Sequence, residues 1–156
     1  MTYRVARISV FSAFSVIGSF LHLPSPIQTV ALDSAPGFFA ALFYGAFDGA
    51  LVSGIGHLAT ASINGFPLGI LHFPIAFGLA GAGGVIGLVS RMRFTGSFGL
   101  GLILGIAINV GLVVLVVPVL GWDWAIAFTP FLIIAATINA AIAALAYGSV
   151  KGRLRI

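Results

Sequence analysis

Long apolar stretches alternate with short segments rich in Gly, Pro, Asn and Asp along the chain. A membrane-spanning helix needs about 20 apolar residues, and several stretches approach that length. The pattern predicts an all-α, integral membrane six-helix bundle. The expected helices cover residues 4–23, 37–47, 70–89, 97–119 and 125–150, with one more that follows a turn at Asp48 and Gly49 and ends near Ser62.

The segments between these helices are short and contain typical turn formers. The main ones are INGFPLG at 63–69, SRMRFTG at 90–96 and GWDWA at 121–125. No linker, low-complexity tract or internal repeat divides the sequence. We therefore expect a single domain over residues 1–156.

The composition agrees with a membrane protein. Hydrophobic residues make up 60% of the chain and charged residues 6%, whereas a soluble domain has about 25% charged residues. A fold of this size has too small a core to hide so much apolar surface, so we expect a multi-pass protein of the cell membrane. There is no cysteine, which excludes disulfides and cysteine-based metal or redox sites.

The basic residues indicate how the helices are oriented. With both termini cytoplasmic, all of them fall on the inner side, as the positive-inside rule expects. They are Arg4, Arg7, Arg91, Arg93, Lys151, Arg153 and Arg155. Such small separate clusters are not the basic stripe of a nucleic-acid-binding protein. The N-terminal run is not interpreted as a signal peptide, because further hydrophobic segments follow it without a clean cleavage site.

Polar and aromatic residues gather at the expected outer end: Asp33, Asn64, His72, Trp122 and Trp124. This convergence predicts an outward-facing pocket. Asp33, within LPSPIQTVALDSAPG at 23–37, is either a helix cap or an acceptor for a ligand hydroxyl or amine. The loop that holds it is expected to be partly extended and to fold over the pocket.

Other polar residues fall inside predicted helices. His57 is a candidate functional residue because an ionisable group at membrane depth is costly unless it is paired. The alternative is a neutral histidine that hydrogen-bonds a neighbouring helix, and for His72 it is an interfacial residue. Asn109 and Asn139 either bind a ligand or join helices through hydrogen bonds. The tryptophans either form an interfacial aromatic belt or a stacking wall. The spacing of the histidines and Asp33 fits no metal signature, so no metal is expected.

Several chemistries lack their motifs. The chain has no Walker sequence, no HExxH, no GxSxG and no paired carboxylates. We therefore expect neither an enzyme nor an ATPase, and no cofactor. A small bundle with an outer pocket and no energy source is typical of a subunit that captures a solute.

The whole chain resembles the substrate-binding (S) components of energy-coupling factor (ECF) vitamin transporters. The more specific segments, LPSPIQTVALDSAP and GALVSGIGHLATASINGFPLGILH, are similar to S components assigned to α-ribazole, a cobalamin precursor. The resemblance implies import together with a transmembrane coupling (T) subunit and two ABC ATPases. It also implies docking of that subunit on a small-residue face of the first helix, here Ser9 and Ala13, which continues to Ser12, Ser15 and Ser19.

For an α-ribazole ligand, the resemblance implies that the ribose is bound by Asp33 with Gln28 or Thr29. His57, Asn64 and His72 would address the sugar or the ring nitrogen, and Phe66 with the Trp122 and Trp124 pair would sandwich the ring. Asn139 is a further candidate for substrate binding. Other vitamins, such as a thiamine precursor, riboflavin or pantothenate, remain alternatives. So do a self-sufficient small channel or transporter and a membrane transferase.

Overall fold

The computed structural model describes residues 2–23, 25 and 30–152. The regular elements in this part of the chain are helical, as the sequence predicts, apart from an isolated bridge between His22 and Ala31. They are α1 (Thr2–Ser19), α2 (Ala35–Tyr44), α3 (Ala46–Ile63), the 3₁₀ turn η1 (Gly69–Leu71), α4 (His72–Val89), α5 (Ser97–Gly111), the 3₁₀ turn η2 (Leu112–Val116) and α6 (Val117–Lys151).

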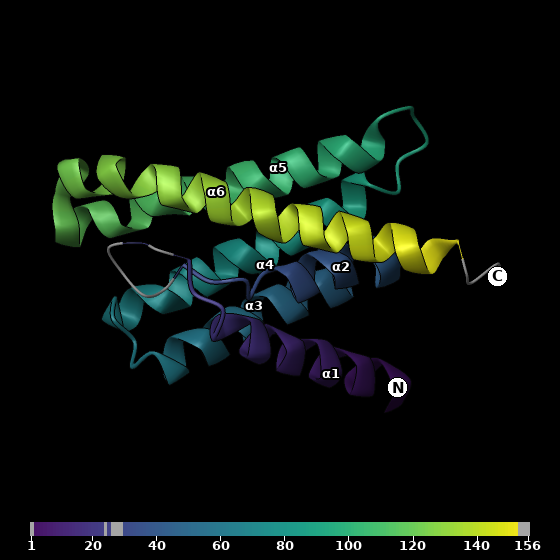
Figure 1. Ribbon diagram of the computed structural model, residues 1–156, viewed down its shortest axis with the longest axis horizontal. Helices are drawn as coiled ribbons and strands as arrows, with labels where there is room; N and C mark the ends of the chain where they lie inside the picture. Colours follow the sequence, from purple (N-terminus) through teal and green to yellow (C-terminus); the bar gives the residue numbers. More distant parts are fainter. Residues whose placement is uncertain (1, 24, 26–29, 153–156) are drawn as a thin grey trace.

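The helices lie side by side along one long axis, and the start of α1 and the end of α6 lie at the same end of the bundle (Figure 1). The short helix α2 is the central element, because it contacts α1, α3, α4 and α6. Its Phe38 and Ala41 are completely buried against Ile86 of α4 and Ala143 of α6. The apolar core therefore forms around α2.

Glycines let α3 and α4 approach closely, as their four-residue spacing predicts. A Cβ added to Gly83 would lie 2.4 Å from the carbonyl oxygen of Gly49, and one added to Gly87 would lie 2.4 Å from the backbone nitrogen of Ala46. Any side chain at these positions would push the two helices apart.

The turn between the second and third helices was predicted at the wrong place. The chain turns at Gly45, with φ of 108°, while Asp48 and Gly49 belong to the first turns of α3. Asp48 is buried and forms ion pairs with Arg7 and, at 3.5 Å, with Arg4. A carboxylate near a helix N-terminus is favourable, so this acid belongs inside the helix.

The turn between the fifth and sixth helices also differs from the prediction. α5 ends at Gly111 and not near 119, and a kink at Gly121, with φ of 81°, replaces the expected turn over 121–125. Trp122 and Trp124 are therefore helical. Glycine adopts positive φ without a steric penalty, which explains why a single residue is enough to redirect the chain.

The surface of the bundle is strongly apolar. Ile70, Phe77 and Leu145 are 80%, 79% and 73% exposed. By length and hydropathy, two stretches of the described chain are suited to cross a membrane, Gly69–Val89 and Ser97–Lys151. How many helices cross the membrane, and on which side the termini lie, stay predictions.

Candidate binding cavity

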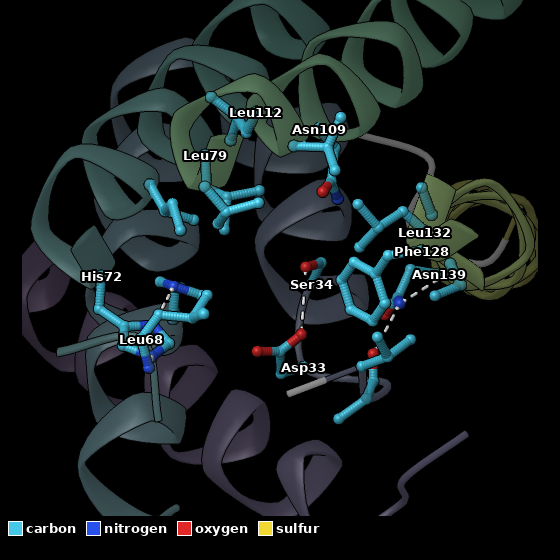
Figure 2. Close-up of a pocket in the computed structure, with 18 residues that line it drawn as sticks. Asp33, Ser34, Leu68, His72, Leu79, Asn109, Leu112, Phe128, Leu132 and Asn139 are labelled. Atoms are coloured by element: carbon cyan, nitrogen blue, oxygen red, sulfur yellow. Dashed lines mark hydrogen bonds between the residues drawn. The ribbon is translucent and has the colours of Figure 1, made fainter. Parts of the chain in front are cut away.

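A cavity of about 80 Å³ lies between the loop before α2 and helices α3, α4, α5 and α6 (Figure 2). One water needs roughly 10–15 Å³ on this measure, so the cavity has room for several waters or part of a small organic molecule. Its lining comprises Val30, Ala31, Asp33, Ser34, His57, Leu68, His72, Ile75, Leu79, Asn109, Leu112, Val113, Val116, Phe128, Leu132, Ala135, Ala136 and Asn139.

The loop between α1 and α2 forms one wall of this cavity. It is partly extended, as expected: Leu23 donates a backbone hydrogen bond to Val30, and Leu32 donates one to Leu21. Gly18 of α1 packs closely against the carbonyl oxygen of Leu32. The loop is thereby fixed to the end of α1, and it presents Asp33 to the cavity.

The carboxyl of Asp33 is buried and bonded to neighbouring groups of the protein. The Ser34 hydroxyl donates to its Oδ1 over 3.2 Å, and the residue's own backbone N–H also bonds to it. The Thr60 hydroxyl lies nearby, but it donates its hydrogen to the Gly56 carbonyl oxygen over 3.0 Å. The residue that precedes α2 is Ser34, so these bonds do not make Asp33 the cap of that helix. Burial raises the pKa of Asp33 to about 6, because desolvation outweighs these hydrogen bonds.

The Asn139 amide is fully occupied by backbone groups (Figure 2). Its Oδ1 accepts from the N–H of Ala35 at 2.7 Å, and its Nδ2 donates to the carbonyl oxygens of Ala31 and Ala135 at 3.0 and 2.9 Å. Both hydrogens of the amide are therefore used. Asn139 fixes the loop and the start of α2 to α6, and so it shapes the cavity wall.

His57 of α3 and His72 of α4 are joined directly, with 3.1 Å between Nε2 of His57 and Nδ1 of His72. The backbone N–H of Leu68 donates to Nε2 of His72 over 3.2 Å. That nitrogen must be unprotonated, so neutral His72 carries its proton on Nδ1 and donates it to His57. In neutral His57 the proton then lies on Nδ1.

This hydrogen-bond pattern argues against a metal at the histidine pair. A histidine that binds metal through one nitrogen donates from the other, whereas Nε2 of His72 accepts. Within the described parts of the chain, no group of three or more His, Cys, Asp or Glu residues is arranged to hold a metal ion.

The cavity brings together only some of the residues expected from the sequence. Asp33, His57, His72 and Asn139 line it. The predicted Gln28 and Thr29 lie outside the described residues.

Four further predicted residues do not line the cavity. Asn64 caps α3 by donating to the Thr60 carbonyl oxygen over 3.0 Å. The Phe66 ring lies edge-on behind His72, with 5.7 Å between the ring centroids. Trp124 packs behind Phe128 with centroids 4.5 Å apart, and Trp122 is exposed.

Sequence reasoning left the role of Asn109 open and missed the apolar lining residues. Asn109 is recognisable as a polar residue within an apolar helix, and its pattern left both ligand binding and helix joining open. Phe128, Leu112 and Leu79 have no such signal, because their apolar neighbours in the sequence look the same.

The small-residue face of α1 is divided. Ser9 and Ala13 are exposed, whereas Ser12, Ser15 and Ser19 are buried within the bundle. The expectation that these three serines continue the same outer face is wrong. Their four- and three-residue steps turn them toward α3, where Ser15 packs against Gly56.

Comparison with known proteins now identifies the family. Residues 3–150 match the family described as "ECF transporter, substrate-specific component". A solved structure, that of the S component of a bacterial ECF transporter, has a similar fold, with a TM-score of 0.78 over 99% of both chains and 20% identical residues. No curated protein matches the chain. The chain therefore belongs to the substrate-specific S components of ECF transporters, which makes it a multi-pass membrane protein of transport and not an enzyme.

Proposed function

We propose that this S component captures an uncharged, vitamin-related molecule, best matched by α-ribazole, on the outer side of the membrane. One observation carries the proposal: among the described lining residues, Asp33 is the acid, and no Lys or Arg accompanies it. A substrate carboxylate would meet this buried acid without a compensating cation. Pantothenate, biotin and folate are therefore disfavoured.

The distribution of polar groups suits a molecule with one sugar-like and one flat apolar end. Asp33, with the Ser34 hydroxyl that donates to it, offers acceptors to ribose hydroxyls. Leu79, Leu112 and Phe128 provide the apolar surface for a dimethylbenzimidazole ring. A mostly apolar pocket with a few placed polar groups is typical of small-molecule sites.

The other predicted residues fit supporting positions in this proposal. His72 orients His57, and Phe66 packs behind His72. Trp124 supports Phe128 in the same way. Asn64 holds the end of α3.

Delivery of the substrate requires partners in this proposal. A coupling subunit would dock on the exposed Ser9 and Ala13 of α1, and two ABC ATPases would supply the energy. Gly18, on the same helix, packs against the loop that holds Asp33. The end of the bundle where α1 begins and α6 ends also carries the connection between α4 and α5, and this end would face the cytoplasm (Figure 1).

A thermal-stability assay of the detergent-purified protein tests the substrate. The panel comprises α-ribazole, riboflavin, a thiamine precursor and pantothenate. A ligand present at 100 times its dissociation constant stabilises by about 2.7 kcal/mol, so α-ribazole should raise the unfolding temperature and pantothenate should not. A shift with another vitamin alone would overturn the α-ribazole assignment and keep the capture role. A shift with none would overturn the capture of these vitamins.

Reconstitution into vesicles tests the dependence on partners. We expect no accumulation of α-ribazole by vesicles that contain this chain alone. Uptake without a coupling subunit and ATPases would instead establish a self-sufficient transporter.

A further inference from the structure

Asn109 of α5 lines the cavity, and its side-chain amide forms no hydrogen bond with the residues that the structure describes. In Figure 2 its amide end points into the lined space, with Leu79 on one side and Leu132 on the other. An amide without a partner in apolar surroundings costs free energy.

Asn139 provides the contrast within the same cavity. All of its donors are bonded to backbone groups of the loop and of α6. These bonds give Asn139 a structural role, because its loss would leave the N–H of Ala35 and the carbonyl oxygen of Ala31 unpaired. Asn109 has no such structural explanation.

The surroundings of Asn109 indicate what it can bind. Its neighbours in the lining are apolar, and they include Leu112 and Val113 one turn further along the chain. The hydroxyl-bonded Asp33 enters the cavity from the opposite side in this view (Figure 2). The part of a ligand that reaches Asn109 is thus apolar overall, with one hydrogen-bonding atom.

We infer that Asn109 is a specificity-determining residue whose Nδ2 donates a hydrogen bond to an unprotonated ring nitrogen of an aromatic heterocyclic substrate. The inference rests on the proposed function and adds the chemical class of the ring. A ring nitrogen is a single acceptor at the edge of an apolar surface, and the Asn109 amide offers it an N–H donor among leucines. Asp33 then binds the sugar end, and Asn109 distinguishes rings with an acceptor nitrogen from rings without one.

The test compares two probes on three proteins. The probes are α-ribazole and the analogue in which the unsubstituted ring nitrogen is replaced by C–H. The proteins are wild type, Asn109→Leu and Asn139→Leu, since leucine has nearly the shape of asparagine. Wild type should bind the analogue about tenfold more weakly than α-ribazole, as expected for one lost hydrogen bond. Asn109→Leu should bind both probes with equal affinity.

Unfolding without ligand separates this role from a structural one. Asn109→Leu should unfold at the same temperature as wild type or higher, whereas Asn139→Leu should unfold at a lower temperature. The inference is overturned if Asn109→Leu loses as much stability as Asn139→Leu, or if it still discriminates between the probes as wild type does. If wild type does not bind α-ribazole at all, the proposed function fails, and this inference fails with it.

Discussion

Asp33 gives the sharpest prediction, because its burial has a calculable consequence. Its pKa rises from 3.8 to about 6 as the loop encloses the carboxyl. At about 1.4 kcal/mol per pKa unit, this shift corresponds to about 3 kcal/mol. The folded protein therefore holds this proton more tightly than the unfolded chain does.

The sign of the effect follows from proton linkage. Between pH 3.8 and about 6 the folded state binds more protons than the unfolded state at Asp33, so stability falls as the pH rises through this window. Above pH 6 the folded protein bears the whole cost of an ionised buried carboxylate. Asp33→Asn keeps the shape of the side chain and removes the charge.

We expect Asp33→Asn without ligand to be more stable than wild type at pH 7.5, by at most about 3 kcal/mol. The gain should shrink as the pH is lowered toward 5. The measurement is thermal unfolding in detergent at several pH values between 5 and 8. Asp123→Asn is the matched control, because Asp123 is exposed on α6 and its replacement should change neither the stability nor its pH dependence.

The same substitution should act in the opposite direction on ligand binding. If α-ribazole hydroxyls donate to the ionised carboxylate, Asp33→Asn should weaken binding, since charge-assisted hydrogen bonds are about twice as strong as neutral ones. Wild-type affinity should fall below pH 6 as the carboxyl is protonated. The reasoning is refuted if Asp33→Asn is no more stable than wild type at pH 7.5, or if the difference does not depend on pH.

Three further predictions concern the packing that holds the cavity. Gly83→Ala should lower the free energy of unfolding by about 1–3 kcal/mol through overpacking, since its Cβ would lie 2.4 Å from the Gly49 carbonyl oxygen. The control is Gly84→Ala, which should be neutral or stabilising because its Cβ has its nearest neighbour at 3.8 Å. Equal effects of the two substitutions on the free energy of unfolding would contradict the packing argument. Asp48→Asn should destabilise the protein, because Arg7 loses its buried partner; stability unchanged in urea or thermal unfolding would show that this pair contributes nothing. His72→Phe should weaken ligand binding more than it lowers stability, because His57 loses the group that orients it while the ring volume is kept. Unchanged affinity for the ligand in the vitamin panel would show that the histidine pair does not contribute to ligand recognition.

The helical architecture could be predicted because long apolar runs and turn-forming residues are local signals. The errors occurred where two local signals compete. Asp48–Gly49 and Gly45 both resemble turns, and Asp48 is kept in α3 by Arg7, which lies far away in the sequence. GWDWA contains a turn former, but the tryptophans continue the helix after Gly121.

The candidate cavity could be predicted only in part, for a related reason. A polar residue within an apolar run is visible in the sequence, and this signal identified His57 and Asn139. Asp33 and His72 were identified because they fall at the expected outer end of the bundle. An apolar wall residue such as Phe128 is not visible, since its role depends on which face of α6 turns inward.

The sequence also could not distinguish polar residues that hold the cavity walls together from polar residues that are available to bind a substrate. Asn109 and Asn139 are both asparagines within apolar stretches of the sequence. They differ in the structure because Asn139 forms three hydrogen bonds to backbone groups, two of them in the distant loop and at the start of α2. Hydrogen-bonding capacity that the protein uses internally stabilises the fold and is not available to a substrate. Recognition in this cavity should therefore depend on the groups whose capacity is left over, the Asp33 carboxylate and the Asn109 amide, with Asn139 and His72 holding the walls that bring these two groups to the same ligand.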